Sequence, residues 1–349
     1  MSSPADGRRR PHLATFILAI VALLAAVALI LEVIPSNYYM LLPGEALAVE
    51  PLISIQGYPQ QHFKGQLFMT DVTIYKVNHK LEELYGRLNP NAELDPAQSF
   101  AGGLSESQYL QLNDELMLDS VQRAEVAALG AARGYKPHFA TKGPEVAFIL
   151  PNLPASRVLQ VDDIILSVDG HAVTNAESVA PLIHAVKPGK KVAITVKRGK
   201  TTHTYQIRTV PSTNGVPKKN GKTPLIGILV RNRLILPVKI SINHENIGGP
   251  SAGLMFALGI VERLQHRDLA RGCRVAGTGA INYLGQVSAI GGARQKVIAA
   301  EHAGAQYFLV PHNPTNMRDA HAAGGNIVIK PVNSLRQALN YLHEIRRCS

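Results

Sequence analysis

An unbroken apolar run near the start of the sequence constrains this chain more than any other feature. Leu13–Leu31 holds nineteen residues without a charge, and Thr15 is the one polar side chain among them. About 20 apolar residues coiled as a helix cross the hydrocarbon core of a bilayer, which is ~30 Å thick. We therefore expect a transmembrane helix over residues 13–34, preceded by a short flank over residues 1–12.

The charges around this run predict its orientation in a cell membrane. Arg8–Arg10 precede it, and the next basic residue is Lys64. Because flanking basic residues stay on the cytoplasmic side, we expect a cytoplasmic N-terminus and an extracytoplasmic chain after residue 34. The alternative is a cleaved signal peptide, whose apolar stretch is usually ~7–15 residues long and ends at a small-x-small site. This run is longer and continues as Glu-Val-Ile-Pro.

The chain after the run is long enough for sizeable folded cores. Its 349 residues and 46% hydrophobic content correspond to about two domains. The net charge of +11 is concentrated in Lys187–Lys239, which holds thirteen Lys and Arg and no acid. Tyr205 is the one aromatic residue there, which is too few for stacking on nucleic acid. We expect a solvated basic surface and no nucleic-acid partner, with attraction to anionic lipid head groups or wall polymer as the alternative.

Periodicity and turn signals divide the outer part of the chain. Residues 35–136 hold extended runs and a helical pattern at Glu106–Arg133, where apolar residues recur near every 3.6 positions. Residues 211–224 are rich in Pro, Gly, Asn and Lys, which predicts a linker. Residues 225–349 alternate strand-like and helix-like segments, as in an α/β domain.

Three patterns approach cofactor sites but lack a required residue. Gly215 and Gly221 are separated by five residues, whereas a phosphate-binding P-loop has four. Two His-Glu pairs lack the second histidine of an H-E-x-x-H zinc motif (His244 and His343, with Gly248 and Arg347 at that position). Two cysteines, Cys273 and Cys348, are too few for a Cys-rich metal site, and the sequence leaves open whether they pair. We expect no cofactor and no metal.

The stretch Leu153–Val173 contains Pro-Ala followed by Leu-x-x-x-Asp-x-Ile-Leu-x-Val-Asp-Gly. This signature resembles the core of a PDZ domain, and the similarity covers residues 137–210. The resemblance implies a β-rich domain with a groove in which an extended peptide adds a strand to the sheet. The family's carboxylate-binding Gly-Leu-Gly-Phe loop has no clear counterpart at residues 141–146, so the sequence does not indicate capture of a free C-terminus. A domain used only for packing is the alternative.

The segment Gly249-Pro250-Ser251-Ala252-Gly253 fits the pattern G-x-S-x-G. One interpretation is the nucleophile elbow of an α/β-hydrolase, in which the serine lies on a sharp strand-to-helix turn. That interpretation needs a later acid and histidine, for which the sequence offers Asp268 or Asp319 and His321 or His343. It also needs several parallel strands before the elbow, where the PDZ-like unit and the linker lie instead.

A second interpretation accounts for more residues. Ile247–Leu258, Val275–Ile281 and Ile290–Ala300 together resemble the proteolytic domain of Lon proteases. With the apolar run, the segment Tyr39–Gly44 and the PDZ-like unit, the chain over about residues 13–345 resembles membrane-anchored, PDZ-containing Lon-like serine proteases. The resemblance implies a catalytic Ser–Lys dyad, and it suggests a ring-shaped homo-oligomer. It assigns the dyad to Ser251 and Lys296, with supporting roles for Thr278, Gly249, Pro250 and Gly253.

The physical chemistry of these residues is compatible with a dyad. A serine hydroxyl is a weak nucleophile until a neighbouring base takes its proton. Lysine serves as that base when burial lowers its pKa from ~10.4 toward ~7–8. Lys296 precedes Val297–Ala300, an apolar setting that can desolvate the ammonium. Ser251 at a helix start would place free amide hydrogens beside a developing oxyanion.

These features predict a mixed α/β and α+β protein that is an ATP-independent, single-pass membrane serine endopeptidase. Its partners would be membrane lipid and extracytoplasmic or membrane-tethered peptides, docked by the PDZ-like domain. Two alternatives stay open. One is an α/β-hydrolase-type esterase that uses Ser251 and a histidine. The other is a non-catalytic, membrane-anchored PDZ adaptor.

Overall fold

The computed structural model describes residues 11–97, 104–136, 138–139, 142–211, 223–244 and 247–348. The chain forms two compact units. The first, called the anchor unit here, comprises Met1–Leu42 and Ile74–Ala97, and the second, called the main unit, comprises Pro43–Thr73 and Gln98–Ser349. Two long strands, β1 (Pro35–Ala48) and β3 (Gln66–His79), contribute residues to both units.

The anchor unit begins with helix α1 (Pro11–Val33). Its segment Thr15–Val33 is nineteen residues long, has a mean hydropathy of 3.0 and is not buried, so it is long and apolar enough to cross a membrane. A signal sequence near an N-terminus has the same properties. The first half of β1 pairs antiparallel with β4 (Glu93–Pro96), and α2 (Lys80–Leu88) packs in the same unit.

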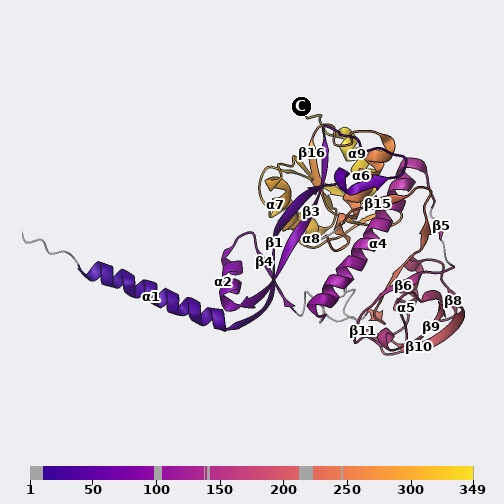
Figure 1. Cartoon of the computed structure of the whole chain (residues 1–349), viewed down its shortest axis with the longest axis horizontal. Coiled ribbons are helices and arrows are strands. Elements are labelled where there is room, and N and C mark those ends of the chain that lie inside the picture. The colour runs from indigo at the N-terminus through magenta and orange to yellow at the C-terminus, as the bar shows by residue number, and fades with distance from the viewer. Residues whose placement is uncertain are drawn as a thin grey trace, which may run out of the picture. The chain divides into compact units, whose positions relative to one another are not determined.

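Part of the main unit is an antiparallel sheet with strand order β10-β9-β7-β6-β13. Figure 1 labels β6, β8, β9, β10 and α5 of this domain. Its elements are β6 (Glu145–Ile149), β7 (Ile164–Val168), β8 (His171–Ala172), β9 (Lys191–Arg198), β10 (Thr201–Arg208), β13 (Ile228–Arg231), η2 (Pro154–Arg157), η3 (Ala176–Ser178) and α5 (Val179–Ala185). Alternate residues of β9, Val192, Ile194 and Val196, are fully buried in the core of this domain. The sheet extends past the expected boundary at residue 210, because β13 follows the linker and pairs with β6.

The rest of the main unit is built on a parallel sheet in which β16 lies between β3 and β19. The strand order of the whole sheet is β20-β19-β16-β3-β1-β4, in which β3, β16, β19 and β20 are parallel. The elements around it are α4 (Glu106–Arg133), α6 (Gly253–Gln265), β16 (Arg274–Gly277), α7 (Ala293–His302), β19 (Tyr307–Pro311), α8 (Pro314–His321), β20 (Val328–Val332) and α9 (Leu335–Glu344). Shorter strands pair as β2 (Ile53–Ile55) with β15 (Ile240–Ile242), β5 (His138–Phe139) with β14 (Leu234–Ile235), β11 (Val210–Pro211) with β12 (Pro224–Leu225), and β17 (Ala280–Ile281) with β18 (Val287–Ser288).

Two helices form the centre of this core. Every residue of α6 from Gly253 to Leu264 is buried, and α4 packs along it. The predicted helix Glu106–Arg133 is confirmed as α4, with a capping box at Ser105 and Gly134 in the left-handed conformation at its end. Residues 35–136, expected to join the anchor to the folded domains, thus supply a central strand and a helix to the core. Cys273 and Cys348 form a disulfide that ties β16 to the C-terminal segment.

Candidate active site

Ser251 lies in a short 3-10 helix, η4 (Pro250–Ala252), which leads directly into α6. The turn before it needs glycine, since Gly249 has a φ of +79°. Two hydrogen bonds connect helix α4 to this turn. The amide of Gly249 donates to the carbonyl oxygen of Asn113 at 3.0 Å, and the Ser120 hydroxyl donates to the carbonyl oxygen of Pro250 at 2.9 Å.

Gly253 allows the start of α6 to lie close to Ser120 of α4 and to Ile281. A Cβ at this position would lie 2.8 Å from the Ser120 Oγ and 2.9 Å from the Ile281 Cγ2. The three residues singled out around Ser251, namely Gly249, Pro250 and Gly253, therefore shape the turn through their backbone. They leave the serine half-buried at the start of a fully buried helix.

Lys296 reaches Ser251 from helix α7. Its Nζ lies 2.6 Å from the Ser251 Oγ and 3.3 Å from the Thr278 Oγ1. The Lys296 side chain is almost fully enclosed, with 4% of the residue exposed. Burial lowers the pKa of Lys296 from its ordinary value to about 8, and the negative charge of Asp71 acts in the opposite direction. A substantial fraction of this amine is therefore neutral near pH 8 and can accept a proton from the serine.

Thr278 connects the Lys296 amine to the backbone of Ser251. Its hydroxyl donates to the carbonyl oxygen of Ser251 at 3.1 Å and accepts from Lys296 Nζ. The next residue, Gly279, donates its amide hydrogen to the same Ser251 carbonyl at 2.8 Å. The segment after β16 thus fixes the backbone of the serine as well as the amine that faces it.

The histidine interpretation receives no support from the hydrogen bonds. Over the described part of the chain, the Ser251 hydroxyl is bonded to Lys296 and to no histidine. Asp268 accepts the amide hydrogens of Gly65 and Gly272, and Asp319 pairs with the adjacent Arg318. Neither acid is linked to a histidine as a triad requires. The described residues also contain no group of three or more His, Cys, Asp or Glu that could hold a metal ion.

Sequence reasoning missed three residues that bear on this site: Asp71, Asn113 and Ser120. Asp71 lies on β3 and accepts the Glu45 amide at 2.5 Å. A Cβ at Gly44 would lie 1.9 Å from the Asp71 Oδ1, so the glycine of the Pro43-Gly44 pair makes room for this carboxylate. Gly44 could have indicated from the sequence that another group packs closely against this turn. Nothing in the local pattern of Asn113 or Ser120 distinguishes them from other polar residues of a helix.

Comparison with known families matches two segments of the chain. A model of the Lon protease (S16) C-terminal proteolytic domain matches residues 244–342, which contain Ser251, Thr278 and Lys296. A PDZ domain model matches residues 131–209. The chain carries a PDZ domain and a Lon-type proteolytic domain. The proteolytic domain supports a serine peptidase, and the two domains together suggest peptide or protein substrates.

Individual relatives match only short segments. Lon protease 2 of Herpetosiphon aurantiacus is 40% identical over 79 residues, which are 23% of this chain and 9% of that protein. Lon protease of Magnetococcus marinus is 41% identical over 63 residues, 18% of this chain and 8% of that protein. The chain thus spans less than a tenth of these relatives. Among solved structures, the PDZ domain of an SdrC-like protein from Listeria monocytogenes is 29% identical, with a TM-score of 0.23, and covers 27% of this chain and 92% of that chain.

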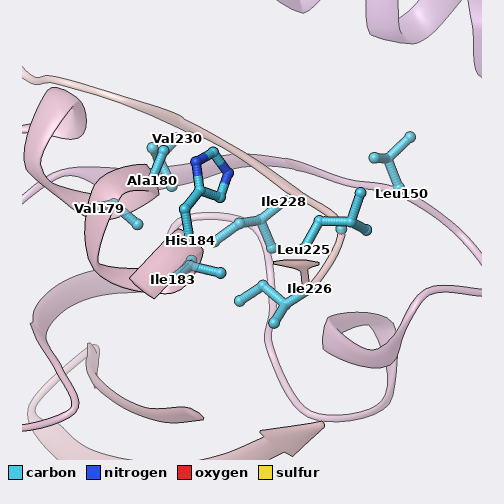
Figure 2. A pocket seen from close by; sticks show the side chains of 10 residues that line it. Leu150, Val179, Ala180, Ile183, His184, Leu225, Ile226, Ile228 and Val230 are labelled. Atoms are coloured by element: carbon cyan, nitrogen blue, oxygen red, sulfur yellow. The ribbon is translucent and has the colours of Figure 1, made fainter. Parts of the chain in front are cut away.

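The PDZ domain contains an apolar groove of about 190 Å³ between α5 and the segment after the linker (Figure 2). Ala180, Ile183 and His184 of α5 line one side, and Leu225–Ile228 and Val230 line the other. Gly227 has a φ of +87°, and a Cβ there would lie 2.4 Å from the Leu153 Cβ. The segment Leu225-Ile226-Gly227-Ile228, which follows the linker, thus lies beside the groove and has an apolar-glycine-apolar order.

Proposed function

We propose that this protein is an ATP-independent serine endopeptidase anchored to the membrane by α1. In this proposal Ser251 is the nucleophile and Lys296 is the general base. The observation that carries it is the 2.6 Å contact between the buried Lys296 Nζ and the Ser251 Oγ, within a domain that matches Lon proteolytic domains.

The proposed reaction follows from this contact. Neutral Lys296 takes the hydroxyl proton as the Ser251 oxygen attacks the substrate carbonyl carbon. The backbone amides of Ser251 and Ala252 would stabilise the resulting oxyanion. The Lys296 ammonium then gives its proton to the leaving amine, and an acyl-enzyme forms on Ser251. Water hydrolyses this ester with Lys296 again acting as the base, while Thr278 holds the amine in place.

The PDZ groove would dock the substrate. Strand β13 is at the edge of its sheet, so an extended peptide can add beside it and place apolar side chains against α5. The loop at Leu225–Ile228 is the position at which the free carboxylate of a C-terminal peptide would bind.

Two features support an extracytoplasmic location for the main unit. The basic residues Arg8–Arg10 lie before α1, which favours a cytoplasmic N-terminus. The Cys273–Cys348 disulfide is of a kind that forms and persists in oxidising compartments and is rare in the cytosol.

The decisive experiment compares the full chain with its Ser251→Ala variant on an unstructured peptide, without ATP and with a chelator present. The wild-type protein should cleave the peptide, and the variant should not. Loss of cleavage on chelation, with recovery on adding zinc, would contradict the proposal. A wild-type protein that binds the peptide but leaves it intact, as the variant does, would instead identify a PDZ adaptor.

A further inference from the structure

Helix α2 of the anchor unit turns an apolar face away from its own unit. Leu81, Leu84, Tyr85 and Leu88 are spaced three and four residues apart and so share one side of the helix. The last three are 41%, 57% and 74% exposed, respectively. Such a contiguous apolar face is costly in water unless something covers it.

The other side of α2 fixes this orientation. The buried Glu83 carboxylate accepts hydrogen bonds from the Ser36 hydroxyl at 2.8 Å, the Lys80 Nζ at 2.7 Å and the Arg87 guanidinium at 2.7 Å. Gly86 packs so closely that a Cβ would lie 3.0 Å from the Leu94 Cδ2. The helix therefore cannot rotate its leucines inward without breaking these ion pairs and inserting side chains where only glycine fits.

The apolar face lies directly beside the end of the candidate membrane span. The amide of Lys80, the first residue of α2, donates to the carbonyl oxygen of Ile34 at 2.9 Å, and Ile34 follows the span that ends at Val33. Figure 1 shows α2 next to that end of α1. Nine residues of helix extend only ~14 Å, so the whole face is within that distance of the boundary between lipid and water.

We propose that α2 lies in the lipid interface beside the end of α1, with Leu84, Tyr85 and Leu88 in the boundary between headgroups and acyl chains. The inference rests on the proposed anchoring by α1. Short amphipathic helices bind this layer with their apolar side, and tyrosine is enriched there. The contact would hold α2 against the bilayer surface.

The absence of tryptophan from the sequence makes a direct test available. In Tyr85→Trp the new residue is the only tryptophan emitter, and the full chain is reconstituted in lipid vesicles. We expect blue-shifted emission and strong quenching by lipids brominated near the headgroup, with weak quenching by aqueous acrylamide. Leu284→Trp is the control, because Leu284 is 84% exposed on the main unit; its tryptophan should respond to acrylamide and not to brominated lipid.

A second variant and an extraction assay separate the outcomes. Adding Leu84→Ser and Leu88→Ser to Tyr85→Trp should shift the emission to the red while the chain still resists carbonate extraction. A chain that washes off the vesicles contradicts the anchoring and this inference together. If the chain resists carbonate extraction but acrylamide strongly quenches the tryptophan emission of Tyr85→Trp, this inference alone is overturned. Shielding from both quenchers would mean that a second copy covers the face, which also overturns it.

Discussion

The Lys296 Nζ is hydrogen-bonded to the hydroxyl groups of Ser251 and Thr278. Because this amine is buried, its surroundings determine its protonation state near neutral pH. A base must be neutral to accept the Ser251 proton. With the pKa lowered to about 8, the cleavage rate should rise with pH through a single titration near that value. The measurement is kcat/KM against pH on a short peptide. A titration near ~6.5, the ordinary range of histidine, would contradict the dyad.

Replacing Lys296 should abolish cleavage without unfolding the protein. Lys296→Met keeps a long side chain in the buried site without a charge, so the fold should persist while cleavage falls on the order of 10³-fold or more. His321→Gln and His343→Gln serve as controls and should stay within about tenfold of wild type. Melting temperatures of all variants, measured beside the rates, distinguish loss of chemistry from loss of fold.

Glu262 is a buried carboxyl outside the proposed mechanism, and it predicts a pH effect on stability. Burial and the neighbouring Glu50 raise its pKa to about 9, although the Leu269 amide donates to its Oε1 and acts in the opposite direction. The folded state then holds a proton that the unfolded chain releases above ~4.5. The free energy of unfolding should therefore decrease as pH rises from about 4.5 to about 9, by up to ~1.4 kcal/mol per pH unit.

The substitution Glu262→Gln should flatten this dependence. A glutamine Oε1 can still accept from Leu269, and its amide can donate to the Glu50 carboxylate. Denaturant titrations at pH 6 and pH 8.5 should show a large loss of stability in the wild-type protein and a small one in the variant. Equal losses in both proteins would mean that Glu262 is ionised in the folded state.

At the scale of elements, α4 supports the proposed nucleophile although it lies almost wholly outside both family matches. Ser120 is 1% exposed, and its hydroxyl satisfies the Pro250 carbonyl. Ser120→Ala leaves this carbonyl without its donor and should loosen the turn. We expect kcat to fall by about tenfold with KM nearly unchanged. Ser107→Ala, on the exposed first turn of the same helix, is the matched control and should keep full activity.

A substitution in the groove of the PDZ domain should change the affinity for long peptide substrates and leave the rate of the chemical step unchanged. Ala180 is exposed and lines the groove from α5, so Ala180→Glu should place a charge among apolar neighbours without disturbing the core. KM for long peptides should rise by about tenfold, while kcat for a short peptide stays the same. Ala185→Glu, exposed on the same helix but outside the groove, should change neither. A parallel loss of kcat in Ala180→Glu would mean that the domain controls the active site.

Local and long-range features of this fold differ in how far the sequence predicts them. The helix Glu106–Arg133 follows from spacing and caps that lie within the helix itself. The pairing partners of β3 and β13 do not follow from such local features. Each strand pairs with a segment distant in the sequence, β3 with β16 and β13 with β6. The short apolar pattern of a strand does not specify its neighbour. For the same reason, motifs in the sequence pointed to Ser251 and Lys296 as candidates, whereas no local pattern pointed to Asp71 or Ser120.

At the scale of the whole molecule, the proposed topology is tested by access from outside. In sealed spheroplasts expressing the full chain with a tag before Arg8, added protease should digest the main unit and spare the tag, because positive residues hold the N-terminus inside. An impermeant thiol reagent should label Cys348 only after reduction, since an oxidising compartment preserves its disulfide with Cys273. Free thiols together with a protected main unit would place it in the cytoplasm. A main unit recovered in the medium without the tag would instead identify α1 as a cleaved signal sequence.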